Sequence, residues 1–261
     1  FIFVTYERVK RLKRMKAILA YDGSNFQGYQ SQPVGRTVQK VVDRALVKMH
    51  KGDTRIHSVA SGRTDAGVHA LGQVIHFDTP FSIPNDRWVV ALNTLLPTDV
   101  RVLQVEEVSP DFHARFDATG KTYLYKWSLA RVHSPFERNQ SVHLDRLRPD
   151  IDRMKEAATY FIGTHDFTSF CSSKTATTNR VRTVRKLTVD RVGEEIHMMI
   201  EGDGFLYNQV RTIAGMLLAV GRGWNEPEEI PEIFAAKDRT RANKTAPAHG
   251  LYLVEVTYDK S

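Results

Sequence analysis

The segment RIHSVASGRTDAGVHALGQVIHFD, residues 55–78, predicts how the middle of this chain folds. Residues 55–60 and 72–78 are patterned as extended strands, and the loop SGRTDAGVHA, residues 61–70, joins them. Glycines allow sharp backbone turns, and a loop held between strands is a usual place for reactive side chains. The loop contains one acid, Asp65. Taken alone, the loop slightly favours an ordinary turn with a surface ion pair over a reactive site.

The first half of the chain is expected to run strand, helix, two strands, helix, strand. The strands show short apolar or alternating runs, and the helices show apolar residues three or four positions apart. In chain order the elements are a strand at 16–21, a helix at 38–49 capped by Thr37, strands at 55–60 and 72–78, a helix between Pro84 and Pro97, and a strand at 100–108.

The second half repeats this order. Its elements are a strand at 121–129, a helix at 151–163, a hairpin of strands at 184–192 and 195–201, a helix at 206–220, and a strand at 250–258. Two β-α-β-β-α-β units predict an α+β fold of two ferredoxin-like, or RNA-recognition-motif-like, modules side by side. We expect a central antiparallel sheet whose helix-free faces form a basic RNA-binding cleft with the Asp65 loop in it.

The modules are expected at residues 15–113 and 114–261, because turn residues interrupt the patterning near 109–118. Residues 1–14 form an unpatterned extension that ends in a basic run. A basic arm for RNA and a targeting leader are alternatives for it. We favour translated upstream sequence with Met15 as the start, since the first patterned strand begins directly after that residue.

Composition narrows the class of protein. The 261 residues are 41% hydrophobic and 26% charged, which is typical of a folded, soluble protein. A single cysteine, Cys171, allows no internal disulfide and fits a reducing cytoplasm. No apolar run approaches the roughly 20 residues that cross a bilayer. The net charge of +7 indicates a polyanionic partner, nucleic acid before an anionic membrane.

Several side-chain groups have both a functional and an ordinary interpretation. Two basic clusters suit a phosphate backbone but equally suit a solvated edge: Arg180, Arg182, Arg185 and Lys186 in one, and Lys237, Arg239, Arg241 and Lys244 in the other. Planar groups suited to stacking on unpaired bases fit a core as well: Phe112, His113, Arg115, Phe116, Tyr123 and Tyr125. Common nucleotide-binding and metal-helix motifs fail to match.

These segments together resemble the tRNA pseudouridine synthase A (TruA) family. The resemblance rests on YDGSNFQGYQ at 21–30, GRTDAGVHA at 62–70, FHARFDATGKTYLYKW at 112–127, FLYNQVRTIAG at 205–215 and APAHGLYLVEV at 246–256. It runs in consistent order from about Met15 to the end of the chain. This covers far more of the chain than any single motif.

The resemblance implies an isomerase, EC 5.4.99.12, that converts uridine to pseudouridine at positions 38, 39 and 40 in the tRNA anticodon stem-loop. It implies a cytoplasmic homodimer that needs no cofactor and no metal. Carried over by motif, Asp65 is the catalytic nucleophile, and Tyr123 stacks on the target base. Arg211 pairs with the acid, and Arg63 lies by the displaced nucleotide.

For this chemistry Asp65 must be an anion, whether it attacks C1′ or C6 or acts as a base. We expect the adjacent Arg211 or Arg63 to lower the pKa of Asp65. The hydroxyl of Tyr123 is a candidate to assist removal of the C5 proton. Two alternatives stay open: a non-catalytic RNA-binding protein, and a pyrimidine-modifying enzyme that uses Cys171 as its nucleophile.

Overall fold

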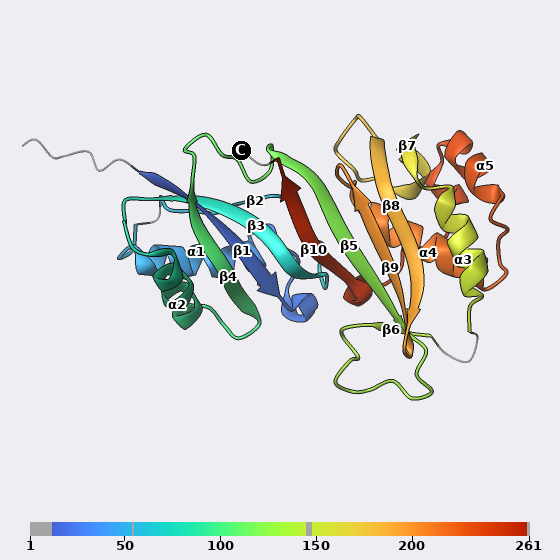
Figure 1. Ribbon diagram of the computed structural model, residues 1–261, viewed down its shortest axis with the longest axis horizontal. Coiled ribbons are helices and arrows are strands. Elements are labelled where there is room, and N and C mark those ends of the chain that lie inside the picture. Colours follow the sequence, from blue (N-terminus) through green and yellow to red (C-terminus); the bar gives the residue numbers. More distant parts are fainter. Residues whose placement is uncertain (1–11, 54, 145–147, 260–261) are drawn as a thin grey trace, which may run out of the picture.

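The computed structural model describes residues 12–53, 55–144 and 148–259 and shows an α+β fold (Figure 1). Within these residues ten strands form one mixed sheet, in the order β4-β1-β3-β10-β5-β9-β8-β7, with β2 beside β3 and β6 beside β5. The strands are β1 (Lys13–Tyr21), β2 (Val59–Ala60), β3 (His69–Thr79), β4 (Val100–Val108), β5 (Ala118–Ser128), β6 (Val142–His143), β7 (Gly163–Asp166), β8 (Val181–Val192), β9 (Glu195–Gly202) and β10 (Leu251–Tyr258).

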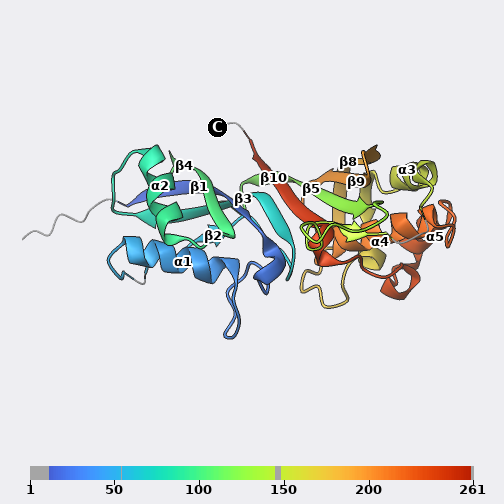
Figure 2. The ribbon, with the colours of Figure 1, turned by 90° about the horizontal axis from the view of Figure 1, so that it is seen from below.

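Five α-helices within the described residues accompany the sheet. They are α1 (Val38–Met49), α2 (Asn85–Leu95), α3 (Ile151–Thr159), α4 (Gln209–Gly221) and α5 (Glu229–Ala236). In Figure 2, α1 and α4 both lie on the lower side of the sheet, under its two halves. None of the helices in the described part of the chain is both long and apolar enough to cross a membrane.

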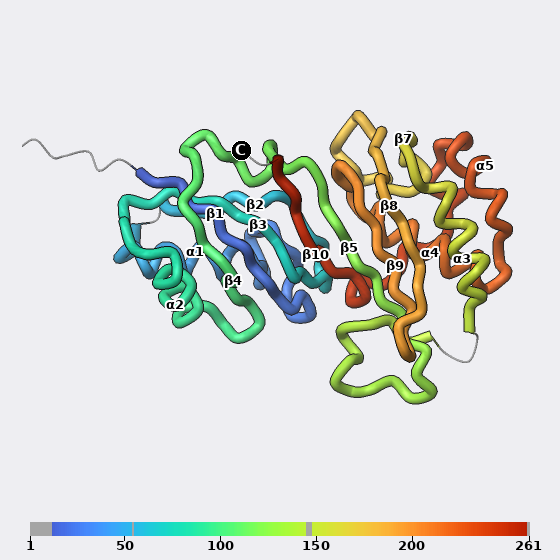
Figure 3. The backbone as a smooth tube through the Cα atoms, in the orientation of Figure 1, coloured from blue at the N-terminus to red at the C-terminus, as the bar shows by residue number. Residues whose placement is uncertain are grey.

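The two halves of the chain supply the two ends of the sheet, and they meet where β3 lies beside β10. The connection from β4 to β5 crosses between the halves at the top of Figure 3. β10 runs antiparallel to β5 but parallel to β3, with His69 opposite Tyr252 and Ala70 opposite Leu253. The expectation of a purely antiparallel sheet is therefore wrong at this junction, because the last strand inserts between the halves and can oppose only one neighbour.

Most expected elements of the first half are confirmed. The Thr37 hydroxyl accepts a hydrogen bond from the Lys40 N–H and caps α1 as predicted. The strand expected at 55–60 is confirmed only at Val59–Ala60. The Asp43 carboxylate in α1 accepts a hydrogen bond from the Ser58 N–H at 2.8 Å. This backbone donor is therefore bonded to a side chain and not to a neighbouring strand.

The first strand begins at Lys13, three residues before the predicted start at Lys16. Arg14 extends it, because its guanidinium donates from two nitrogens to Asp78 on β3 at 2.8 Å each. Residues 13 and 14 are thus part of the sheet. Most of the predicted N-terminal extension, residues 1–11, lies outside the described residues.

In the second half the sequence did not reveal β6, β7 and α5. Strands of two and four residues are too short to show alternation. Helix α5 contains Pro231, which normally argues against a helix. Proline is tolerated there because it stands in the first turn, where backbone N–H groups have no partner within the helix.

The junction between the halves requires a glycine at position 72. A Cβ atom on Gly72 would stand 2.3 Å from the carbonyl oxygen of Val254 in β10. The pairing of β10 with β5 shifts register between Leu253 and Glu255, so Val254 is the bulged residue. The bulge turns this carbonyl toward β3, and only a residue without a side chain allows the two strands to approach so closely.

We predict that Gly72→Ala destabilises the protein by about 1–3 kcal/mol, because the new methyl group meets backbone that cannot move aside cheaply. Urea denaturation followed by circular dichroism measures this change. Gly204→Ala is the matched control, since its Cβ would meet no atom within 4 Å. The control should be neutral or slightly stabilising, and equal effects of the two substitutions would contradict the prediction.

Candidate active site

The Asp65 loop connects β2 to β3 and is held by backbone contacts from the segment before α1. The Tyr29 N–H donates to the Thr64 carbonyl at 3.0 Å, and the Val68 N–H donates to the Asp65 carbonyl at 3.1 Å. A Cβ on Gly28, whose φ is +92°, would lie 2.9 Å from the Thr64 oxygen. These contacts hold the backbone on both sides of the acid.

The start of the loop is anchored from within the sheet. The Gln73 amide, fully buried on β3, accepts from the Ser61 hydroxyl at 2.7 Å and donates to the Gly62 carbonyl at 3.0 Å. The hydroxyls of Tyr21 and Thr64 are hydrogen-bonded at 2.7 Å. Buried polar groups paired in this way specify a single arrangement of the loop.

Asp65 forms an ion pair with Arg211, a residue 146 positions away in the first turn of α4. The Arg211 Nη1 donates to the Asp65 Oδ2 at 3.0 Å, and the two side chains are 18% and 23% exposed, respectively. The Arg211 Nε also donates to the Ala246 carbonyl at 2.8 Å. The pairing expected for these two residues is confirmed, and it joins the two halves of the chain.

The pKa of Asp65 is raised above its ordinary value of 3.8, so the expected lowering is wrong. Burial is the largest cause, because it disfavours the charged carboxylate. The hydrogen bond and positive charge of Arg211 act in the opposite direction without reversing the effect. Arg211 therefore limits the rise that burial imposes.

Tyr123 lies on the core-facing side of β5, opposite Leu253 of β10 and Ile200 of β9. It is 8% exposed, and its ring meets the edge of the Phe205 ring at a centroid distance of 5.3 Å. Burial, followed by the nearby Tyr21 and the Asp65 charge, raises the pKa of Tyr123 far above neutrality. Its hydroxyl stays protonated at neutral pH, so a free phenolate base is not available.

Arg63 is exposed and is hydrogen-bonded to Gln30. Its Nε donates to the Gln30 Oε1 at 3.0 Å. The ion pair of the acid is made with Arg211 instead. Proximity in sequence therefore misled the first expectation for Arg63, and its exposed guanidinium is available to a partner molecule.

Lys121 is a site residue that the sequence analysis did not single out. Its Nζ donates to the Ser61 carbonyl at 2.9 Å and lies 2.4 Å from where a Cβ of Gly62 would stand. Burial, assisted by the charge of Arg115, lowers the pKa of Lys121 to about 8. The sequence could have indicated Lys121 as a site residue through its position two residues before Tyr123, because this spacing places both side chains on one face of the strand.

The site lies on the helix-bearing side of the sheet, because Asp65 pairs with a residue of α4. The expectation that it lies among helix-free faces is wrong. On the helix-free face, basic side chains of the strands are matched by acids: Arg14 with Asp78, Lys16 with Glu106, Lys126 with Glu195, and Arg185 with Glu201. This neutralisation leaves that face poorly suited to a polyanion.

The alternative in which Cys171 is the nucleophile loses support. Cys171 is fully buried, with its Sγ 3.7 Å from the Thr168 carbonyl, so it is not placed to attack a substrate. Among the described residues no group of three or more histidines, cysteines or acids is placed to hold a metal ion.

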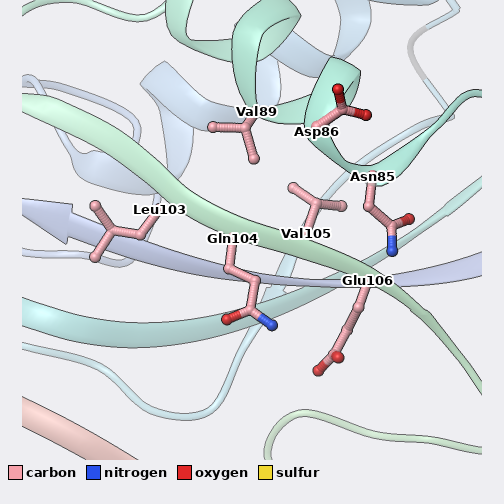
Figure 4. Close-up of a pocket in the computed structure, with 7 residues that line it drawn as sticks. All are labelled: Asn85, Asp86, Val89, Leu103, Gln104, Val105 and Glu106. Atoms are coloured by element: carbon pink, nitrogen blue, oxygen red, sulfur yellow. The ribbon is translucent and has the colours of Figure 1, made fainter.

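Two shallow hollows lie apart from Asp65. One is at the outer edge of the sheet between α2 and β4 (Figure 4) and is lined by Asn85, Asp86, Val89, Leu103, Gln104, Val105 and Glu106. The other lies beside α1, with Ser31 and Lys40 among its lining residues. The predicted RNA-binding cleft corresponds to neither hollow.

Comparison with known proteins defines the class. The sequence model of the family described as tRNA pseudouridine synthase matches residues 17–117 and 157–259, which include Asp65 and Arg211, respectively, while Tyr123 lies between the two matched ranges. A chain in the solved Cbf5-Nop10-Gar1 complex superimposes with a TM-score of 0.34 and 11% identity, over 78% of this chain and 54% of that chain. That likeness is too low to bear on function. The family match defines the protein as a pseudouridine synthase.

Curated relatives make the assignment narrower. The chain is 54% identical to tRNA pseudouridine synthase A of Bacillus pumilus (strain SAFR-032), over 94% of this chain and 99% of the relative. It is 51% identical to the enzyme of that name from Lysinibacillus sphaericus (strain C3-41), over 95% and 100%, and 50% identical to that from Bacillus subtilis (strain 168), over 94% and 99%. The chain belongs to the tRNA pseudouridine synthase A family, and the resemblance seen in the sequence is confirmed.

We predict that Asp65→Asn raises the stability of the folded protein at neutral pH, because the neutral amide removes a buried charge. A carboxyl whose pKa is raised by folding imposes no cost below its unfolded value and loses stability as the pH rises through its folded value. The melting temperature of the variant should exceed that of the wild type at pH 7. The difference should vanish as the pH falls below 3.8.

Asp53→Asn is the control of opposite sign. Hydrogen bonds from Arg55 lower the pKa of Asp53 to about 2, so its charge favours the folded state at neutral pH. This variant should not gain stability. An Asp65→Asn variant that melts below the wild type at pH 7 would contradict the interpretation of the Asp65 pKa.

Proposed function

We propose that this protein isomerises uridine to pseudouridine at positions 38, 39 and 40 in the anticodon stem-loop of tRNAs. The observation that carries the proposal is the ion pair of Asp65 with Arg211, made by the two family motifs GRTDAG and VRT from opposite halves of the chain. Lys121 and Tyr123 approach the same loop from β5. Membership of the tRNA pseudouridine synthase A family supports the same reaction.

The reaction needs no co-reactant. The bond from C1′ to N1 breaks, the uracil turns, and a bond from C1′ to C5 forms, while the C5 proton is lost and N1 gains a proton. Nothing is oxidised or reduced. The nucleotide must first leave its stack, at a cost of a few kcal/mol.

Each residue is proposed for one role. Asp65 acts as the anion, by attack on C1′ or C6 or as the base that leads to a glycal. Tyr123 confines the uracil while it turns, because its ring is held edge-on against Phe205 and cannot swing freely. Arg211 keeps Asp65 ionised against the effect of burial. Arg63, being exposed, contacts the displaced nucleotide.

We place the RNA on the helix-bearing side of the sheet. The supporting observations are the location of Asp65 there and the neutralised charges of the opposite face. Arg63 of the catalytic loop is an exposed cation at the site, and Lys244 is exposed two residues before Ala246, whose N–H donates to the Arg211 carbonyl. Phosphate contacts of this kind would position the tRNA.

The remaining expectations stand as proposals. We propose two ferredoxin-like modules, residues 15–113 and 114–261, with the basic cleft between them receiving the anticodon arm. The continuous sheet and the repeated order of elements support this division. A homodimer that acts in the cytoplasm follows from the resemblance alone.

We predict that Asp65→Asn retains tRNA binding but loses turnover by at least about a thousandfold, because the amide cannot act as nucleophile or base. Tritium release from tRNA containing 5-tritiated uridine measures turnover, and filter binding measures affinity. Release at the wild-type rate by this variant would refute the proposed function.

The two arginines should differ in how they affect the pH profile. Arg211→Gln should move the acid limb of kcat/KM to higher pH, since it removes the cation that opposes protonation of Asp65. Arg63→Gln should lower kcat/KM by about tenfold through lost contact with RNA and leave the acid limb unmoved. A shifted limb in the Arg63 variant, or an unshifted one in the Arg211 variant, would contradict these roles.

A further inference from the structure

Asn208, directly before α4, has an unusual backbone conformation. Its φ of 63° lies in the left-handed region, which is costly for residues other than glycine. Lys51 and Lys237 share this conformation among the described non-glycine residues. Both follow helices, where the left-handed region is a common way to end the helix. Asn208 stands at a helix start, where an extended backbone is usual.

The side chain of Asn208 does not cap the helix that it precedes. Asparagine is favoured at this position because its side-chain oxygen normally accepts a backbone N–H of the first turn. Here no such bond is made. The Asn208 Oδ1 instead accepts a hydrogen bond from the Arg211 Nη1 at 3.0 Å. The Asn208 side chain therefore does not stabilise the start of α4 by capping it.

The guanidinium of Arg211 is thereby held at three points. Its Nη1 donates both to the Asn208 Oδ1 and to the Asp65 Oδ2, each at 3.0 Å, and its Nε donates to the Ala246 carbonyl at 2.8 Å. A long arginine side chain has many rotamers, and RNA phosphates compete for it. The Asn208 Oδ1 and the Ala246 carbonyl are neutral acceptors, so they restrict the Arg211 guanidinium without adding a second negative charge to that of Asp65.

We propose that Asn208 is a positioning residue, which holds the Arg211 guanidinium on Asp65 and prevents it from turning toward the phosphates of incoming RNA. This inference rests on the proposed function for its benefit to catalysis. The left-handed backbone directs the side chain to Arg211 in place of the helix. Backbone strain is thus retained at a site where it serves an interaction and not the helix.

The titration of the Asp65 carboxyl can test the proposal, because the groups that interact with this carboxyl can be named. Arg211 from α4 and Tyr123 from β5 are the charged or titratable groups that interact with it, with Tyr21 of β1 adjacent to Tyr123. Arg63, from the same loop, is directed to Gln30. Since Tyr123 stays neutral, a looser Arg211 should appear as a higher titration midpoint of the Asp65 carboxyl.

Asn208→Gly tests the proposal, because glycine adopts the left-handed backbone without strain and removes only the side-chain acceptor. We expect a melting temperature close to that of the wild type and a kcat/KM about tenfold lower. The Asp65 carboxyl, followed by 13C NMR in RNA-free protein and identified with Asp65→Asn, should titrate at higher pH. Lys51→Gly is the matched control and should change neither activity nor this titration.

Asn208→Asp is the second variant. Aspartate tolerates this backbone and caps helices well, but its charge would compete with Asp65 for Arg211. It should raise the Asp65 midpoint and lower activity while the protein stays folded. Wild-type titration and activity in Asn208→Gly would overturn the proposal, as would lost activity with an unchanged midpoint and a lower melting temperature. If wild-type protein releases no tritium from tRNA, the proposed function fails, and the titration still decides the role of Asn208.

Discussion

The ion pair between Asp65 and Arg211 is the interaction on which the geometry of the candidate active site depends. A largely buried pair is stable only when both partners are held in good geometry and their remaining polar atoms are satisfied. The first half of the chain holds the acid through its hydrogen-bonded loop, and the second half holds the arginine through Ala246 and Asn208. The two halves must therefore be fixed relative to each other, which the parallel junction of β3 with β10 achieves.

The balance of charge and burial defines the chemistry of the site. Burial raises the pKa of Asp65, and Arg211 counteracts part of that rise, so the carboxyl group is held in surroundings that favour its neutral form. Burial also keeps Tyr123 neutral, which suits a ring that confines a base more than a group that abstracts a proton unaided.

The net charge of +7 is not distributed evenly over the two faces of the sheet. Acids on the helix-free face neutralise strand cations such as Arg14 and Lys126. Arg63, in the loop of Asp65, and Lys244 are exposed. The net charge alone could not show this asymmetry, because salt bridges between strands depend on which residues lie opposite in the sheet.

The sequence by itself determined the α+β class, most helices and long strands, and the identity of the candidate residues, because periodicity and contiguous motifs are local properties. It failed for β6, β7 and α5, where the elements are short or contain a proline. Only the tertiary structure decided that β10 lies parallel to β3, that the site is on the helix-bearing side, and that burial outweighs Arg211 at Asp65. It also revealed Lys121 and Asn208. These features depend on contacts between residues far apart in the chain and on exclusion of water, which no local pattern of residues records.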